Sequence, residues 1–184
     1  MKNIFIITIL ILSGAICAWG LNDQKIDKSV GQANNYSEEQ KALFRQHIPS
    51  IAKQFIGIPY KLGGNPTQTG TADNSHLFFS IYALAAQKAG LSYKEYLPMK
   101  YLLGNIRKVD GNDLQNGDLI VLNDDHTAMI YHVENTGQLH FIYASEKRQQ
   151  VLSFNSDNVV FPAYWLGNIK GFFRLSDMML APAD

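Results

Sequence analysis

The chain has 184 residues, and its 16 lysines and arginines balance its 16 aspartates and glutamates, so the formal net charge is zero. This balance argues against a dedicated nucleic-acid binder, which normally carries a basic excess or a basic stripe. Hydrophobic residues make up 46% of the chain, as in a globular domain, which excludes disorder throughout. The single cysteine, Cys17, excludes an internal disulfide and a multi-cysteine metal site. We expect one domain at this length.

Residues 1–20 have the three parts of a secretory signal peptide. Lys2 supplies a positive charge, residues 4–12 form an apolar run, and small residues follow. The run is shorter than the roughly 20 apolar residues of a membrane span. Small residues at Ala18 and Gly20 predict cleavage after Gly20 and hence a secreted or periplasmic protein. In the alternative, Cys17 is lipidated or the segment stays uncleaved, and the protein then reaches the membrane only through this segment.

A polar linker is expected over residues 21–36, and the folded domain over 37–175. Ser37 and Gln40 form a capping-box pattern that predicts the start of a helix. Pro49 is expected to split or kink this helix, which should end before Gly57.

A turn-rich loop over residues 57–72 precedes the clearest helix of the chain. Asp73 is a good N-cap, apolar residues then recur at spacings of three and four, and Gly90 should end the helix. Residues 91–112 are ambiguous, with a short helix expected around 97–104.

Further along the chain, the hydrophobic pattern changes to that of strands separated by turn residues. We expect short strands at 118–122, 127–133, 139–144, 150–154 and 171–175, and a flexible tail over 176–184. Helices followed by strands indicate an α+β domain, with N-terminal helices packed on a mostly antiparallel sheet of about five to six strands.

Three histidines, His126, His132 and His140, lie in or beside the expected strands and prompt the question of a metal site. Asp124 and Asp125 precede His126, but they look like turn residues, and the sequence has no HExxH pattern. We therefore predict ordinary strand histidines, with no metal and no cofactor.

The start of the helix after Asp73 is a candidate site for nucleophilic chemistry. Residues 74–76 lie at the positive end of this helix, where a nucleophilic thiolate is best stabilised. His126 opens a strand that could place a general base opposite this helix end. Papain-like cysteine peptidases use this geometry, with the nucleophile on a helix and the histidine on an adjoining strand.

The sequence resembles the NlpC (NlpC/p-sixty) family of papain-like peptidoglycan endopeptidases, from about Ile51 to Leu175. Six segments carry the resemblance in the right order: the helix, Pro-Tyr and Gly-Gly loop at 52–64; D-C-S-G at 73–76; L-x-P-G-D-L at 114–119; H-V-G-I-Y at 126–131; F-I-H-A-S at 139–145; and the closing segment at 164–174. The resemblance implies a papain-like NlpC-type fold and a place in the bacterial cell envelope. It also implies peptidoglycan stem peptides, or another envelope protein, as partners.

The departures from the family pattern concern its catalytic residues. The position of the family nucleophile holds Asn74, whose neutral carboxamide cannot ionise to a nucleophile near neutral pH. His76 replaces the motif's glycine, and Tyr143 stands at the position of the family's third polar residue. His126, the presumptive base, and Tyr60 of the Pro-Tyr pair remain.

We therefore predict a catalytically inactive NlpC-like protein that still binds a ligand. Its cleft should be lined by Tyr60, Asp73, Asn74, Ser75, His76, His126 and Tyr143. One alternative is an active peptidoglycan hydrolase with Ser75 as nucleophile and His126 as base, although neighbouring helix residues point about 100° apart. Another is replacement chemistry by His76, His126 and a metal.

Overall fold

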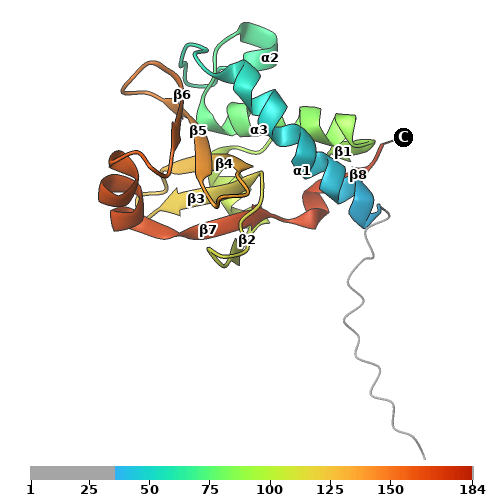
Figure 1. Cartoon of the computed structure of the whole chain (residues 1–184). Helices are drawn as coiled ribbons and strands as arrows, with labels where there is room; N and C mark the ends of the chain where they lie inside the picture. Colours follow the sequence, from blue (N-terminus) through green and yellow to red (C-terminus); the bar gives the residue numbers. More distant parts are fainter. Residues whose placement is uncertain (1–35, 184) are drawn as a thin grey trace, which may run out of the picture. The chain divides into compact units, whose positions relative to one another are not determined.

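The computed structural model describes residues 36–183, in which helices come first and strands follow (Figure 1). The predicted signal peptide, Cys17 and the linker up to residue 35 lie outside the described residues. Tyr36, the last residue of the predicted linker, is buried, and its hydroxyl donates to the carbonyl of Asp177 over 2.7 Å. None of the helices within 36–183 has the length and apolar character of a membrane span.

Helix α1 (Glu38–Ala52) begins with the predicted capping box. The backbone N–H of Gln40 donates to Ser37 Oγ over 3.1 Å, and the backbone N–H of Ser37 donates to Gln40 Oε1 over 3.0 Å. These two bonds satisfy N–H groups that the first turn of a helix otherwise leaves without a partner.

Pro49 does not split this helix, since α1 runs on to Ala52 before the 3-10 turn η1 (Lys53–Phe55); the kink that was the other part of the expectation stays a prediction. A proline inside a helix has no N–H to donate to the carbonyl four residues earlier. That carbonyl belongs to Arg45, and it accepts from Asn116 Nδ2 over 3.3 Å instead. The tertiary contact thus supplies the donor that Pro49 lacks.

Helix α3 (Asn74–Lys88) begins after Asp73, as predicted. The chain leaves it at Gly90, whose φ of +68° is a conformation that favours glycine. Within the turn-rich loop over 57–72, a single helical turn, α2 (Pro66–Thr69), was not expected. Helices α1 and α3 lie side by side against the sheet (Figure 1).

Six strands form one antiparallel sheet in the order β2-β7-β3-β4-β5-β6, which confirms the predicted α+β class. Each of the five predicted strands is present, the last beginning two residues earlier than expected. The bounds are β2 (Ile106–Val109), β3 (Asp118–Leu122), β4 (Thr127–Val133), β5 (Leu139–Ser145), β6 (Gln150–Asn155) and β7 (Ile169–Leu175).

Residues 177–182 form regular elements, whereas we expected a flexible tail over 176–184. The turn η5 (Asp177–Met179) leads into strand β8 (Leu180–Pro182), which pairs antiparallel with β1 (Leu91–Tyr93) in a second, two-stranded sheet. The remaining short elements are α4 (Met99–Leu102), η2 (Leu103–Asn105), η3 (Phe161–Trp165, a π-helical turn) and η4 (Leu166–Asn168).

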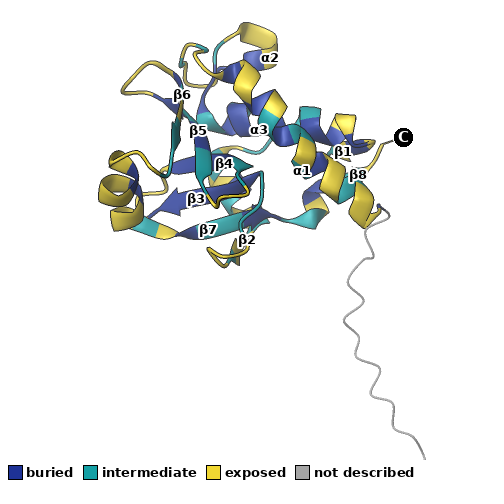
Figure 2. Ribbon diagram, in the orientation of Figure 1, coloured by how far each residue is buried: buried dark blue, intermediate teal, exposed yellow. Residues whose placement is uncertain are grey.

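Both faces of the central strands are buried, as the dark colour of β3 and β4 shows in Figure 2. Leu119 and Val121 of β3 belong to the larger core cluster, which the sheet shares with α1 and α3. Ile120 and Leu122 alternate with them and join a second cluster that includes Trp165 of η3. The period-two alternation of a strand therefore supplies two cores, one on each face of the sheet.

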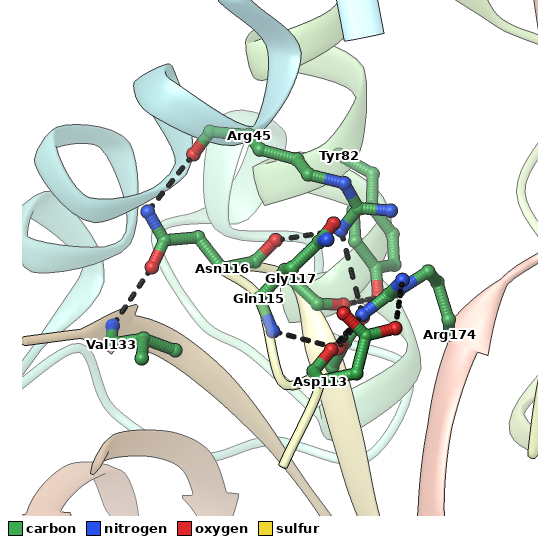
Figure 3. A network of polar contacts seen from close by, with 9 residues as sticks. Arg45, Tyr82, Asp113, Gln115, Asn116, Gly117, Val133 and Arg174 are labelled. Carbon is green, nitrogen blue, oxygen red and sulfur yellow. Dashed lines mark hydrogen bonds and ion pairs between the residues drawn. The ribbon is translucent and has the colours of Figure 1, made fainter. Parts of the chain in front are cut away.

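A buried ionic network holds the start of β3 (Figure 3). Asp118 is fully buried and accepts two hydrogen bonds from Arg174, from Nε over 2.9 Å and from Nη2 over 2.8 Å. Arg45 of α1 lies 3.5 Å from the same carboxylate, and the backbone N–H of Gln115 donates to it over 2.9 Å. One carboxylate thus joins α1, β3 and β7.

The turn before β3 is packed closely against the helices. Gly117 has a φ of +91°, and a Cβ at this position would lie 2.5 Å from Ile48 Cδ1. Its carbonyl accepts from the Tyr82 hydroxyl over 2.6 Å, and the side chain of the preceding Asn116 accepts from the Val133 backbone over 2.8 Å (Figure 3). A glycine is therefore required here by both conformation and space.

Candidate functional site

A cleft of about 720 Å³ lies among the start of α3, the β3–β4 turn, the end of β5 and the turn η3. It brings together six of the seven residues that the sequence analysis assigned to it: Tyr60, Asp73, Asn74, Ser75, His126 and Tyr143. His76 comes from the same helix end but is not among the residues that line the cleft. The fold therefore gathers into one cavity segments that are more than 80 residues apart in sequence, from Tyr60 to Tyr143.

Asp73 organises the helix end beneath the cleft. Its Oδ1 accepts from the backbone N–H of His76 over 2.8 Å and from the Ser75 hydroxyl over 2.9 Å, and it lies 3.0 Å from His76 Nδ1. Its Oδ2 accepts from the backbone N–H of Gly63 over 2.8 Å. Burial alone would raise the pKa of this carboxyl group, but these hydrogen bonds outweigh burial and lower the pKa.

The loop with the Pro-Tyr and Gly-Gly pairs is fastened to this helix end. Tyr60 forms a parallel bridge with Ala72, and the backbone N–H of Asp73 donates to the Gly64 carbonyl over 3.2 Å. A Cβ at Gly64 would lie 2.9 Å from both the Lys61 carbonyl oxygen and the backbone carbon of Thr71. The small residue lets the two arms of the loop approach, and so places Tyr60 at the cleft.

Asn74 occupies the first position of α3 and lines the cleft. Its Oδ1 accepts from the backbone N–H of Ala144 in β5 over 2.6 Å. The register between β4 and β5 ends at Met129 and Ile142, so this amide of β5 lies beyond the last β4 partner. The Asn74 side chain therefore connects α3 to the sheet.

Ser75 is buried, and within residues 36–183 its hydroxyl makes no hydrogen bond to a histidine. It donates to Asp73 Oδ1, and it lies 3.0 Å from the Tyr96 hydroxyl. The ring of His76 stacks on Tyr96, with 4.1 Å between the ring centroids. Asp73, Ser75 and His76 are the residue types of a hydrolytic triad. Here the serine and the histidine are each bonded to the aspartate, and no hydrogen bond joins the serine to the histidine as a triad requires. The geometry gives no support to a hydrolase with Ser75 and His126.

His126 lies in the turn before β4, and 63% of its side chain is exposed. Its backbone N–H donates to Asp124 Oδ1, and its Nδ1 lies 3.1 Å from Asp124 Oδ2. The hydrogen bond from the His126 backbone is the main cause of the lowered pKa of Asp124. Within residues 36–183, no hydrogen bond joins His126 to Asn74 or Ser75. The presumptive base is thus present at the cleft without a nucleophile bonded to it.

Aromatic side chains form one wall of the cleft. Tyr143 of β5 packs edge-on against Trp165, with 5.6 Å between ring centroids, and Trp165 packs edge-on against Tyr164. Tyr60 lies at the same cleft, where burial and the nearby Glu146 raise the pKa of its phenol. Tyr143 therefore contributes aromatic packing to this wall.

The sequence analysis did not assign several charged residues that line the cleft. Glu146, Lys147 and Arg148 are exposed in the turn after β5 and make no ion pair within residues 36–183. Asp125, in contrast, pairs with Lys170 over 3.0 Å. The sequence shows these three charged residues as a turn. A turn composition does not indicate that the turn lies beside a cleft. No signal in the sequence pointed to Tyr96.

No group of three or more histidines, cysteines or acidic residues in the described part of the chain is arranged to hold a metal ion. His132 and His140 face each other across β4 and β5, with 5.4 Å between ring centroids, and His140 Nε2 bonds to Glu134 Oε1 over 2.7 Å. This pair lies away from the cleft residues and joins neither His76 nor His126.

Comparison with known proteins finds similarity in structure and none in sequence. No family model matches the chain, and no curated protein matches it in sequence. Among four solved chains that match is one from Staphylococcus aureus subsp. aureus Mu50, described as similar to a lipoprotein of the NLP/P60 family. The two are 21% identical with a TM-score of 0.51, over 79% of this chain and 44% of that one. The chain has an NlpC-like fold.

This likeness agrees with the resemblance found in the sequence and concerns the architecture. The chain spans less than half the length of the Staphylococcus aureus protein. Because one fold can carry many activities, the function of the NlpC-like cleft follows from its own residues.

Proposed function

We propose that this protein is a non-catalytic, cell-wall-associated member of the NlpC-like proteins whose cleft binds peptidoglycan stem peptides. The observation that carries the proposal is the side chain at the start of α3. Asn74 stands there with its Oδ1 bonded to Ala144 of β5. A neighbouring histidine cannot convert a carboxamide into a nucleophile by removing a proton near neutral pH. The cleft therefore lacks the nucleophile that forms the acyl-enzyme intermediate of a cysteine peptidase.

Binding remains compatible with the geometry of the NlpC-like cleft. A volume of about 720 Å³ lies within the range of small-ligand sites, and aromatic side chains beside polar groups are typical of such sites. Tyr60, Tyr143 and Tyr164 offer apolar faces, while Asn74 and Arg148 offer hydrogen-bond donors. A short peptide with apolar and charged groups suits this lining. Export through the N-terminal segment would bring the protein to the envelope, where such peptides occur.

The test has a hydrolysis arm and a binding arm. The purified protein is incubated with purified peptidoglycan, released muropeptides are measured by mass spectrometry, and a cell-wall hydrolase of known activity is run in parallel. We expect no release above the level without protein, together with co-sedimentation of the protein with the insoluble wall. Release that disappears in the His126→Ala variant would contradict the proposal, and so would failure to co-sediment. The His47→Ala variant controls for loss of an unrelated histidine.

A further inference from the structure

We propose that an apolar surface beside the NlpC-like cleft binds the sugar to which a peptidoglycan stem peptide is attached. This inference rests on the proposed function and extends the ligand of the same cleft from a peptide to a glycopeptide. We call this surface the apolar rim, and it consists of the exposed side chains of Val159, Val160, Tyr164 and Leu166.

Exposed apolar side chains are concentrated in the segment that carries the apolar rim. The described residues have nine large hydrophobic side chains that are exposed, and four of them lie in this short segment between β6 and β7. Val159 is 81% exposed and Val160 is 50% exposed. Figure 2 shows the segment as mostly exposed. Single exposed hydrophobic residues are common, but a group of them marks a binding surface.

Buried aromatic side chains of the same segment hold the apolar rim in place. Phe161 and Trp165 are buried and belong to the second core cluster. Trp165 stacks on Phe154 of β6 with 5.1 Å between ring centroids, and the exposed Tyr164 packs edge-on against Trp165 at 5.8 Å. A ring held in this way loses little conformational freedom when a ligand binds. Tyr164 is therefore a platform that is fixed before binding.

The apolar rim continues the lining of the cleft. Val160 and Tyr164 line the cleft, whereas Val159 and Leu166 lie outside its lining. In peptidoglycan, the amino end of each stem peptide is joined through a lactyl group to a sugar of the glycan strand. A stem that is bound in the cleft while it is still part of the wall therefore brings a sugar ring to the edge of the cleft.

The chemistry of the apolar rim suits an uncharged sugar ring. Residues 158–169 contain no charged side chain and no histidine. The sugar at the end of a stem is also uncharged, because its lactyl carboxyl group forms the amide bond to the peptide. One face of a sugar ring consists of C–H groups polarised by neighbouring oxygens, and these are attracted to the negative face of an aromatic ring. The sugar hydroxyl groups stay in water, because the rim is exposed.

The experiment compares two ligands by isothermal titration calorimetry. One is a synthetic stem peptide with an N-acetylmuramoyl group at its amino end, and the other is the same peptide with an acetyl group there. Both amino ends are amides, so the two ligands carry the same charge and differ in the sugar-bearing group. We expect the unaltered protein to bind the muramoyl peptide about fivefold more tightly, which is the order of one aromatic contact.

Four variants test whether the apolar rim causes this preference. Tyr164→Ala removes the platform and should make the two peptides bind equally, whereas Tyr164→Phe keeps the ring and should keep the preference. Val160→Ser is a second rim variant and should reduce the preference. Tyr101→Ala is the matched control, since Tyr101 is 61% exposed but does not line the cleft, and it should leave both affinities unchanged. Melting temperatures check that each variant is folded, and Val160→Ser decides the test if Tyr164→Ala does not fold.

The outcomes distinguish this inference from the proposed function. Equal binding of the two peptides by the unaltered protein, or a preference that persists in both rim variants, overturns the sugar assignment and leaves the binding function intact. A stem peptide with a cyclohexanecarbonyl group at its amino end that binds as tightly as the muramoyl peptide also overturns it, because the rim would then accept any apolar ring. If the unaltered protein binds none of these peptides and does not co-sediment with the wall, the proposed function fails, and this inference with it. If it binds none of them but does co-sediment, the sugar inference alone fails.

Discussion

At the scale of single residues, Asp73 has the most partners around the NlpC-like cleft. It caps α3, holds Ser75 and His76, and fastens the loop at Gly63. Burial costs the charged form free energy, and the hydrogen bonds more than offset this cost, as the lowered pKa of the carboxyl group indicates. The same residue therefore shapes the site and stabilises the fold.

We expect Asp73→Asn to lower the free energy of unfolding at pH 7 by about 1–3 kcal/mol, the range for hydrogen bonds to a charged group. The new side chain can still accept from the His76 N–H, but its amino group cannot accept from Gly63. Because the pKa of Asp73 is lower in the folded state, its stabilisation is complete above the ordinary carboxyl pKa of about 4 and is lost as pH falls through the folded pKa.

The measurement is urea unfolding of both proteins between pH 7 and pH 3. The difference between them should shrink as the pH falls. Glu95→Gln, which changes an exposed carboxylate that makes no ion pair within residues 36–183, serves as the control and should leave stability unchanged. A difference that stays constant over this range would mean that the charge of Asp73 has no part in stability.

At the scale of elements, the C-terminal segment belongs to the core. Met179 and Leu180 are 5% and 6% exposed and belong to the larger core cluster, whereas the neighbouring Met178 is 61% exposed. Strand β8 also closes the second sheet by pairing with β1. Packing of these side chains, together with the strand pairing, orders a segment whose composition resembles that of a tail.

The two adjacent methionines provide a matched test of this packing. Met179→Ala should lower the free energy of unfolding by about 2–5 kcal/mol, because it removes a buried side chain and leaves a cavity. Met178→Ala changes an exposed side chain and should cost less than about 0.5 kcal/mol. Thermal and urea unfolding measure both. Equal effects of the two substitutions would contradict the ordered C-terminal segment.

At the scale of the whole molecule, Asp118 joins α1, β3 and β7 through Arg45 and Arg174. The hydrogen bond to Asp118 is the main cause of the raised pKa of Arg174, while burial lowers the pKa of Arg45. These charges connect a helix to two neighbouring strands of the sheet. Their pairing therefore fixes how the layers that carry the cleft meet.

We expect Asp118→Asn to lower the free energy of unfolding by about 3–5 kcal/mol, since it leaves a buried guanidinium without its counter-charge. Asp113 bonds to the same Arg174 but has a side chain that is 65% exposed, so Asp113→Asn should cost at most about 1 kcal/mol. Urea unfolding at pH 7 compares the two variants. Similar decreases in the free energy of unfolding for the two variants would contradict the expected contribution of the buried Asp118–Arg174 pair.

The sequence predicted much of this architecture because local rules agree with the fold. Asp73 and the apolar periodicity located α3, and alternating apolar residues located the strands from β3 to β6. The continuity of α1 through Pro49 was not predicted, because the donor that replaces the missing N–H of Pro49 comes from Asn116, which is distant in sequence. Local patterns carry no information about such a donor.

The sequence predicted part of the candidate site. The resemblance to the NlpC family placed Asn74 and His126 together, and both line the cleft. It did not indicate that the Ser75 hydroxyl would turn to Asp73, or that His76 would stack on Tyr96. The directions of these side chains depend on neighbours that only the folded chain brings near.

By itself the sequence determined the α+β class, the start of α3 and the presence of a carboxamide, Asn74, at its first position, because residue identity and local periodicity decide these features. Only the tertiary structure decided what the carboxamide does. The backbone N–H of Ala144 lies beyond the last residue of β5 that pairs with β4, and it donates to the Asn74 oxygen. The Asn74 amino group makes no such bond to the sheet. A contact between residues 70 apart in the chain exists only after folding.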